Sequence, residues 1–401
     1  MNILMAWELG GGTGHTVKLT RIGASLANKG HHISYALRNP LTAETLNIDP
    51  DTPIFRAPIM GVLKSKQQAA YDYADLLLRR GYEDEARLDS RIDAWLRLFD
   101  RTQPDQLVAD HAPCARLAAH MAGIPSHAIG CGFAVPPFCD PLHAFLPSQQ
   151  PRSTLQKRLE TRLNEAINKA LKRRGKSAVD RAATIFIGGS RFICTIEELD
   201  SYPDRSGETL LGPISQSSHG LEPQWPKTDG KRIFIYLGPD VPLLPVALAG
   251  LRRMKIPTLV FAGPDGAEHF AHAACPTITL AKRPVDMSRL ADNCDLIICQ
   301  GGNGTIAAGL IQGIPVLTYP MHVEQLTACR NMQSRGLGRM LTGKIEEDRF
   351  TQTVTSMLDD EAMHRQVLAV TKKYRDLKPD QVAEGIATSI DRSEDNNAPH
   401  Y

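Results

Sequence analysis

A histidine follows a glycine-rich turn near the start of the chain, in the segment "ELGGGTGH" that ends at His15. A neutral imidazole accepts a proton near neutral pH, so this residue could act as a general base on a hydroxyl group. Position alone favours a structural role, because an isolated histidine more often has a structural role than a catalytic one. The apolar run before the turn predicts a strand, however, and strand ends line ligand sites in open α/β sheets.

An acid closes a second apolar run, "QLVAD", which ends at Asp110 and is followed by His111. A carboxylate here could orient a base imidazole and stabilise its charged form. Asp110 could also be the N-cap of the helix that "APCARLAAHMAG" predicts. The two roles are compatible, because a cap residue also lies at the carboxyl end of the strand.

The segment "QGGNGT", which begins at Gln300, enters a helix-like stretch from another apolar run. Gly301, Gly302 and Gly304 permit a tight turn that leaves backbone N–H groups directed at an anion. Thr305 can add its hydroxyl at the start of the helix, where the helix dipole favours negative charge. The pattern therefore favours a phosphate site, although the turn holds no Lys, Arg or His. An ordinary strand-to-helix turn is the alternative.

An acid and an amide follow the next predicted strand, in the segment "MHVEQ" that contains Glu324 and Gln325. Together they offer acceptor oxygens and amide donors, which suit the hydroxyl groups of a sugar. The alternative is the solvated start of a helix.

The elements that must position these residues form two similar halves. "MNILMAWEL", "HTVKLTRIGASLANKG" and "HHISYAL" predict a strand, a helix and a strand, which is a βαβ unit of a parallel sheet. The same order of strand, glycine-bearing turn and helix begins again at "KRIFIYLG". We therefore predict an α/β protein with a first domain over 1–210, a linker rich in Pro, Gly and Ser over 211–230, and a second domain from 231. Both glycine-rich turns are expected to face a cleft between the two sheets.

Composition excludes several classes of protein. The 401 residues exceed one ordinary core, and the net charge of +2 gives no indication of a nucleic-acid partner. The longest apolar runs are far shorter than a membrane span, and no signal peptide is predicted. The eight cysteines contain no C-x-x-C motif, which favours free thiols in a reducing cytoplasm over a metal site or disulfides.

Two tempting motifs fail on spacing. "GGGTGH" has His15 where a dinucleotide fingerprint needs its last glycine. "GGSR" is followed by Phe192 where a serine hydrolase elbow needs glycine.

The predicted helix over 152–174 carries eight Lys or Arg and two Glu residues. A solvated face is the favoured interpretation. Peripheral contact with a membrane that carries a lipid acceptor is the alternative.

Over nearly its whole length the chain resembles the family 1 glycosyltransferases with the GT-B fold. The resemblance is strongest over 294–338, "CDLIICQGGNGTIAAGLIQGIPVLTYPMHVEQLTACRNMQSRGLG", and "GTGHTVKLTRIGASLANKGHHISYA" is similar to the family's N-terminal signature. "WELGGGTGH" and "LVADHAP" are similar to bacterial glycosyltransferase-like proteins. The resemblance implies two Rossmann-like domains, with a nucleotide-sugar-binding domain over 231–375. It also implies a helix over 376–392 that returns to the first domain, before a frayed tail over 393–401.

The resemblance also implies roles for single residues. His15 matches the base that deprotonates the acceptor, and Asp110 matches the acid that supports it. Glu324 and Gln325 match the pair that holds the donor sugar. The remaining donor-binding positions are Gly14, Gln300, Gly302, Asn303, Gly304 and Thr305, with backbone groups near Arg283 and Val285 at the nucleotide base.

The activity implied is inverting transfer of a sugar from a UDP- or dTDP-sugar to a hydroxyl of a small-molecule or lipid acceptor. It needs no metal and no cofactor, because the helix dipole and Gln300 would stabilise the departing nucleoside diphosphate. Segments around 60–80 and 131–146 are expected to line the acceptor site.

Three positions depart from the family pattern. Gln300 replaces a histidine, which weakens a hydrogen bond to phosphate by about 1 kcal/mol. Ala308 replaces the glutamate that grips the ribose hydroxyls, which suggests a deoxythymidine donor without a 2′-hydroxyl. Lys18 replaces a proline. Gln300 and Ala308 motivate the alternative of a catalytically impaired nucleotide-binding or partner protein, whereas the presence of both a base and a sugar-binding pair favours an enzyme.

Overall fold

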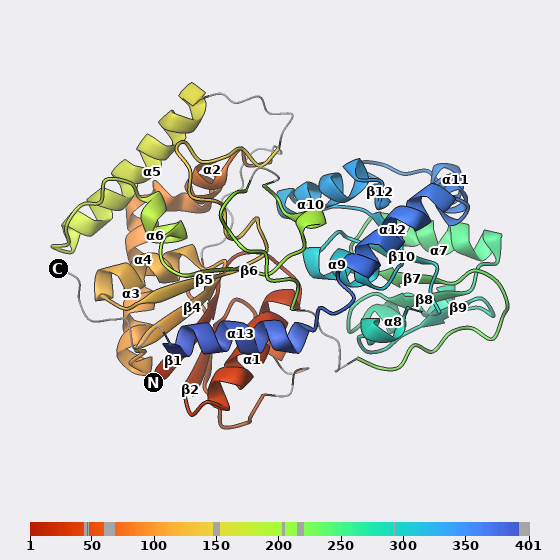
Figure 1. Ribbon diagram of the computed structural model, residues 1–401, viewed down its shortest axis with the longest axis horizontal. Coiled ribbons are helices and arrows are strands. Elements are labelled where there is room, and N and C mark those ends of the chain that lie inside the picture. The colour runs from red at the N-terminus through yellow and green to blue at the C-terminus, as the bar shows by residue number, and fades with distance from the viewer. Residues whose placement is uncertain are drawn as a thin grey trace. The chain divides into compact units, whose positions relative to one another are not determined.

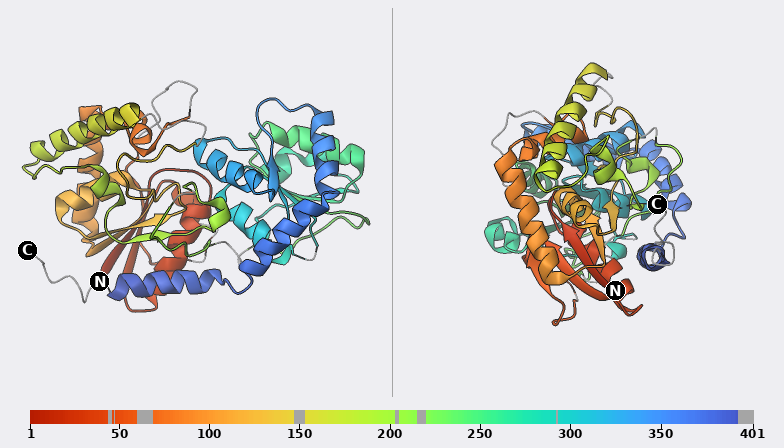
Figure 2. Two further views of the ribbon diagram at one scale, coloured as in Figure 1. Left: turned by 45° about the horizontal axis from the view of Figure 1, so that its top comes forward. Right: turned by 90° about the vertical axis from the view of Figure 1, so that its left-hand side faces the viewer.

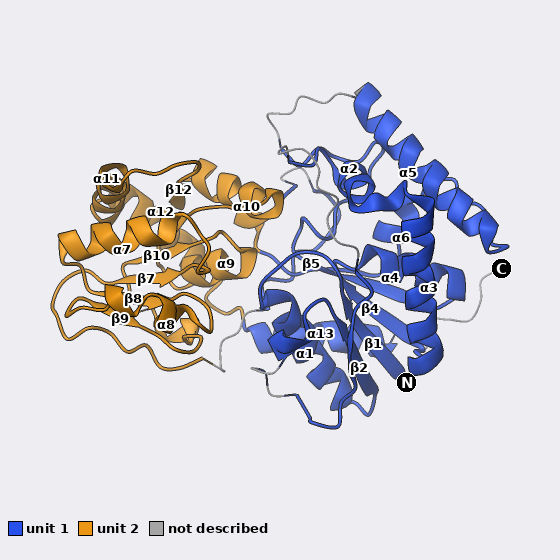
Figure 3. Ribbon diagram, turned by 180° about the vertical axis from the view of Figure 1, so that it is seen from behind, with its two compact units in different colours: residues 1–195, 201–214, 378–401 blue, residues 196–200, 215–377 orange. Residues whose placement is uncertain are grey.

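The computed structural model describes residues 1–43, 46, 48–59, 69–146, 153–202, 205–214, 220–291 and 293–392. The predicted tail over 393–401 and part of the predicted acceptor segment, 60–68, lie outside these ranges. The chain forms two units (Figure 3). Unit 1 comprises Met1–Thr195, Ser201–Ile214 and Lys378–Tyr401, and unit 2 comprises Ile196–Asp200 and Ser215–Leu377.

Unit 1 is built on a six-stranded sheet in the order β3-β2-β1-β4-β5-β6, in which all neighbours pair in parallel. The strands are β1 (Asn2–Trp7), β2 (His32–Leu37), β3 (Ile54–Arg56), β4 (Gln106–Asp110), β5 (Ser126–Gly130) and β6 (Arg191–Ile193). The two central strands, β1 and β4, are buried except at Asn2 and apolar in their interiors, as a sheet covered on both faces requires.

Helices cover both faces of this sheet (Figures 1 and 2). They are α1 (Gly14–Ala27), α2 (Tyr73–Leu77), α3 (Glu85–Thr102), α4 (Pro113–Ala122), α5 (Ser153–Arg173), α6 (Ala183–Ile187) and α13 (Pro379–Arg392). The crossover through α1 leads from β1 to β2, and the crossover through α4 leads the other way, from β4 to β5. Right-handed crossovers in opposite directions place α1 and α4 on opposite faces.

The last helix of the chain, α13, packs against the first helix, α1, within unit 1 (Figure 1). Its apolar face, with Ile386 and Ile390, is buried in the same core as Ile22 and Leu26 of α1. An ion pair between Arg21 and Asp380, 2.6 Å apart, adds to this contact.

The basic helix α5 uses much of its charge within unit 1. Its cationic side chains, and Arg174 just after it, form ion pairs with carboxylates in or just before α3; the pairs are Arg162–Glu83, Lys169–Glu85, Arg173–Asp89 and Arg174–Asp93. These residues therefore hold α5 beside α3. The alternative of membrane contact stays a prediction.

Unit 2 repeats the architecture. Its six parallel strands lie in the order β12-β11-β10-β7-β8-β9. The strands are β7 (Ile233–Tyr236), β8 (Thr258–Phe261), β9 (Ile278–Leu280), β10 (Leu296–Cys299), β11 (Val316–Thr318) and β12 (Gly338–Met340). The helices are α7 (Leu243–Met254), α8 (Gly266–His269), α9 (Asn303–Ile311), α10 (Val323–Ser334), α11 (Glu347–Leu358) and α12 (Glu361–Lys373). Numbered from its own first strand, each sheet has the order 3-2-1-4-5-6, so the predicted α/β class with two parallel sheets is confirmed.

All eight cysteines are free thiols, and six of them are buried. Within the described ranges, no helix combines the length and the apolarity that a membrane crossing needs.

Glu8, at the end of β1, holds the start of α4. Its two carboxylate oxygens accept the backbone N–H groups of Cys114, at 3.1 Å, and Ala115, at 2.6 Å. The cap residue Ala112 has no side chain that could do so. Burial raises the pKa of Glu8 to about 7, although Arg91 and the two N–H groups oppose the shift.

This raised pKa predicts a pH-dependent stability. Between pH 4.5 and about 7 the folded state keeps a proton on Glu8 that the unfolded chain has lost, so the free energy of unfolding falls as pH rises through this window. The contribution is about 3 kcal/mol. Urea unfolding should give a lower free energy of unfolding at pH 8 than at pH 5 in the wild-type protein, and this difference should be absent in Glu8→Gln.

The unfolding experiments should be made in a common Trp225→Phe background. The two remaining tryptophans, Trp7 and Trp95, both lie in unit 1 and then report the unfolding of that unit by fluorescence. Glu165→Gln, which changes an exposed residue of α5, is the matched control and should keep the pH dependence. Equal pH dependence in the unchanged protein and in Glu8→Gln would contradict the assignment.

Candidate active site

His15 lies in the first turn of α1, directly after the exposed Gly14 that opens the helix. Its side chain is nearly buried, and its ring stacks on the indole of Trp7, with centroids 5.0 Å apart. Gly10 lies against the ring as well. A Cβ at Gly10 would be 2.4 Å from the Nε2 atom of His15, so this position needs glycine for space as well as for its φ of +90°.

Asp110 faces His15 from the neighbouring strand. β1 and β4 pair so that Trp7 lies opposite Asp110, which brings the ends of the two strands level. Nδ1 of His15 lies 3.0 Å from Oδ1 of Asp110, and the aspartate is fully buried. The N–H direction does not point at the oxygen closely enough for a hydrogen bond. Such loose geometry is common at catalytic pairs before substrate binds.

Lys18 is the second partner of Asp110. Its Nζ donates to Oδ2 at 2.9 Å, and its side chain is 11% exposed. Burial alone would raise the pKa of Asp110, but the close contacts of His15 and Lys18 outweigh burial and lower that pKa to about 2. Asp110 is therefore a carboxylate at every physiological pH.

The glycine-rich turn of unit 2 follows β10 and leads into α9. Gly301 has φ +91°, and a Cβ there would lie 2.2 Å from the Sγ atom of Cys329. Gly302 is the extended N-cap of α9, and its carbonyl accepts the N–H groups of Thr305 and Ile306. The preceding amides, of Asn303 and Gly304, have no intrahelical carbonyl to bond, so the helix end directs them outward. This is the backbone arrangement that binds anions.

Three polar side chains surround this helix end. Those of Gln300 and Thr305 are half-buried. Gln300 lies beside Gly238, where an added Cβ would be 3.6 Å from the Oε1 atom of the amide. The Nδ2 atom of Asn303 lies 3.5 Å from the carbonyl oxygen of Leu199, to which it donates. Ala308, one turn into the helix, presents only a methyl group.

Glu324 and Gln325 lie in the first turn of α10 and are half-buried. The Oε1 atom of Gln325 accepts the backbone N–H of Met321 at 2.8 Å. This contact fixes the amide and leaves its NH₂ group as the end that can donate to a ligand. Glu324 offers two acceptor oxygens in the same turn.

Arg283 and Val285 differ in exposure. The side chain of Arg283 is exposed, whereas Val285 is buried and forms a parallel bridge with Leu221. Leu221 bonds to the carbonyl of Pro284 and the N–H of Asp286. The N–H and C=O groups of Val285 itself therefore point to the other side of the chain, as alternate groups of an extended strand must.

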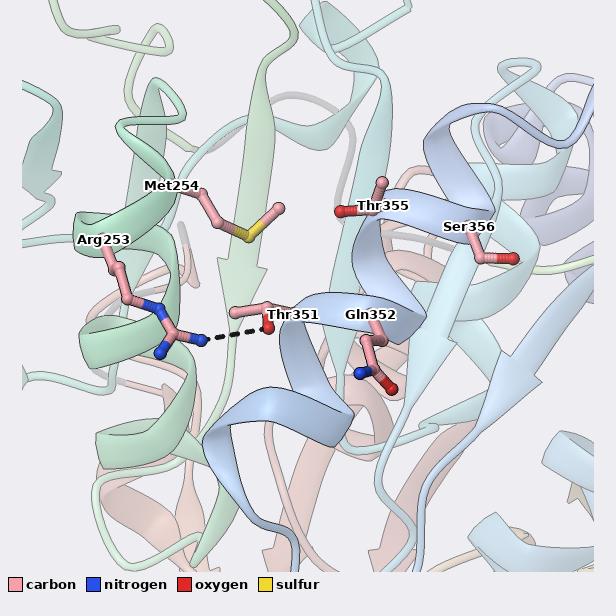
Figure 4. Close-up of a pocket in the computed structure, with 6 residues that line it drawn as sticks. All are labelled: Arg253, Met254, Thr351, Gln352, Thr355 and Ser356. Carbon is pink, nitrogen blue, oxygen red and sulfur yellow. Dashed lines mark hydrogen bonds between the residues drawn. The ribbon is translucent and has the colours of Figure 1, made fainter.

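A groove of about 450 Å³ in unit 2 is remote from these residues. It lies between α7 and α11 and is lined by Arg253, Met254, Thr351, Gln352, Thr355 and Ser356 (Figure 4). Since α7 runs antiparallel to the strands, Arg253 and Met254 at its end lie at the edge where the strands begin. The glycine-rich turn lies at the opposite edge, so the groove is not part of the candidate site.

The structure thus brings His15 and Asp110 together in unit 1, and it groups 300–305 around one helix end in unit 2. The sequence-based prediction did not include Lys18, Trp7 or Gly10 in the site. Lys18 could have been found, because it follows His15 by three residues and so lies on the same face of α1.

Comparison with known proteins finds similarity to glycosyltransferases. Residues 260–388 match the family of the erythromycin biosynthesis protein CIII-like C-terminal domain. A zeaxanthin glucosyltransferase of Pseudescherichia vulneris is 20% identical over 398 residues, covering 90% of this chain and 92% of the relative. A PGL/p-HBAD biosynthesis rhamnosyltransferase of Mycobacterium bovis is 24% identical over 287 residues, covering 67% of this chain and 63% of the relative.

Solved structures share the fold over nearly the full length. A calicheamicin glycosyltransferase superposes with a TM-score of 0.69 at 16% identity, covering 99% of both chains. A spinosyn rhamnosyltransferase complexed with thymidine diphosphate has a TM-score of 0.66 at 17% identity, covering 96% of this chain and all of the other. With its two doubly wound sheets and these superpositions, the chain has the GT-B fold, and the sequence matches support its resemblance to the family 1 glycosyltransferases.

Proposed function

We propose that this glycosyltransferase inverts the anomeric configuration in a single displacement and uses His15 as its base. The observation that carries the proposal is the contact of His15 Nδ1 with the buried Asp110, 3.0 Å away. Because Asp110 contacts Nδ1, the free nitrogen for chemistry is Nε2. The acceptor oxygen attacks the anomeric carbon as its proton passes to Nε2, and the bond from that carbon to the diphosphate breaks.

The donor half of the proposal rests on unit 2. The diphosphate lies at the start of α9, where the amides of Asn303 and Gly304 and the hydroxyl of Thr305 can donate to it. Glu324 and the NH₂ group of Gln325 bind sugar hydroxyls. The backbone of Val285 binds the base, with Gln300 donating to the leaving phosphate in place of a metal ion.

Ala308 affects which nucleotide the donor carries. With a methyl group one turn into α9, this position has no acceptor for a ribose hydroxyl, so a 2′-hydroxyl gains nothing there. We therefore propose a deoxythymidine diphosphate sugar as the donor. The spinosyn rhamnosyltransferase structure with thymidine diphosphate supports the choice by analogy of fold.

His15→Ala should lower kcat by about 10²–10⁴, because general-base catalysis contributes a factor of that order. The measurement is release of nucleoside diphosphate from a panel of UDP- and dTDP-sugars, with acceptor or by slow hydrolysis. His32→Ala, which removes an exposed histidine of β2, is the matched control and should retain activity.

An unchanged kcat in His15→Ala would refute the role of the base. If the unchanged protein binds nucleotides but turns over no donor in the panel, the second candidate applies. That candidate is a nucleotide-binding partner protein with this fold, which Gln300 and Ala308 favour.

Nucleotide preference can be tested with UDP, dUDP and dTDP, since UDP and dUDP differ only by the 2′-hydroxyl. In thermal-shift titrations the unchanged protein should bind dUDP at least as tightly as UDP. Ala308→Glu should improve UDP over dUDP by about fivefold, the value of one hydrogen bond of about 1 kcal/mol.

Ala271→Glu adds the same charge at an exposed position of unit 2 and should leave the preference unchanged. A clear preference of the unchanged protein for UDP over dUDP would overturn the deoxynucleotide proposal.

A further inference from the structure

We propose that Lys18 is a positioning residue that supplies the countercharge of Asp110 and so disfavours an imidazolium at His15, the residue that must accept the acceptor's proton. The inference rests on the proposed role of His15 as base. Its geometric basis is that one buried carboxylate has two partners: Oδ2 accepts from Lys18 at 2.9 Å, and Oδ1 lies 3.0 Å from His15.

Charge balance in a buried site gives Lys18 its effect. With Lys18 charged and Asp110 ionised, the three groups are electrically neutral when His15 is neutral. Protonation of His15 then gives the buried group a net positive charge, which is costly away from water. Without Lys18, the neutral arrangement is a carboxylate paired with an imidazolium. That imidazolium already carries the proton that a base must accept.

The charge of Lys18 is itself held in place by Asp110. Burial alone would lower the pKa of Lys18, but the carboxylate outweighs burial and raises that pKa. Among the described residues, the thiols of Cys131 and Cys194 also act on Lys18. Burial raises the pKa of Cys194 to about 12, so this thiol does not compensate for the loss of the lysine charge.

Lys18 also orients the carboxylate. By holding Oδ2, it leaves Oδ1 toward the imidazole, while Trp7 stacks on the ring from β1. A purely structural lysine would have this orienting effect and no influence on protonation. The two roles therefore separate in variants that keep a donor but lose the charge.

Lys18→Gln keeps a hydrogen-bond donor without charge, Lys18→Met fills similar volume without either, and Lys18→Arg keeps the charge. The pH at which His15 is half protonated, followed by NMR of the labelled imidazole, should rise by about 1–2 in Lys18→Gln and Lys18→Met. It should stay near the original value in Lys18→Arg. On the acid limb of the kcat/KM profile, a midpoint that is higher by one on the pH scale lowers the rate about tenfold.

Lys29→Gln is the matched control, because Lys29 follows the same helix but pairs with Glu384, 2.7 Å away on α13. It should leave the midpoint unchanged. The two neutral variants give the proposal two independent tests, and a folded variant is recognised by its thermal transition. An unchanged or lowered midpoint in a folded neutral variant would overturn the proposal.

The NMR titration needs no turnover, so it separates this inference from the proposed function. A raised midpoint in an enzyme whose kcat is unaffected by His15→Ala would support the charge coupling and refute the base. An unshifted midpoint together with a strong loss of kcat in His15→Ala would refute the charge coupling and support the base.

Discussion

The parallel pairing of the two central strands is the constraint on which each unit depends. β1 pairs with β4 so that Trp7 is level with Asp110, and β7 pairs with β10 so that Tyr236 is level with Cys299. From each central pair, the right-handed crossovers lead in opposite directions along the sheet, so their helices pack on opposite faces. The turns that follow the central strands are then left uncovered by these helices. His15, Asp110 and the turn after Cys299 all occupy such positions.

The two units use this position in chemically different ways. In the proposed mechanism the group at the strand end of unit 1 exchanges a proton, and the site there holds titratable side chains in a nearly dry environment. A fully buried carboxylate is tolerable there only because two cationic or proton-bearing partners surround it. In the same proposal the group at the strand end of unit 2 holds a permanent anion. Backbone amides suffice for that, and they leave the turn without a charged side chain.

Much of this arrangement follows from the sequence. Apolar runs and glycine-rich turns predict both sheets, and the rule that strand ends line ligand sites selects His15, Asp110 and Gln300–Thr305. Partners across the fold are harder to predict. Lys18 contacts an aspartate 92 residues away, and although its spacing from His15 places it on the same face of α1, that spacing does not reveal its partner. The charges of α5 likewise appear in the sequence as a solvated or membrane-binding face, because composition does not reveal that the acids of α3 lie beside them.

The short segment Ile196–Asp200 belongs to unit 2, although the residues on both sides of it belong to unit 1. Lys373 and Tyr374 bond to the carboxylate of Glu198, and Asn331 donates to the carbonyl of Asp200. Neither unit is therefore one continuous piece of polypeptide. A chimera that exchanged unit 2 between two relatives at a single crossover point would keep this segment from the wrong parent. Compatible halves would require the exchange of both Ile196–Asp200 and Ser215–Leu377, with α13 left in place.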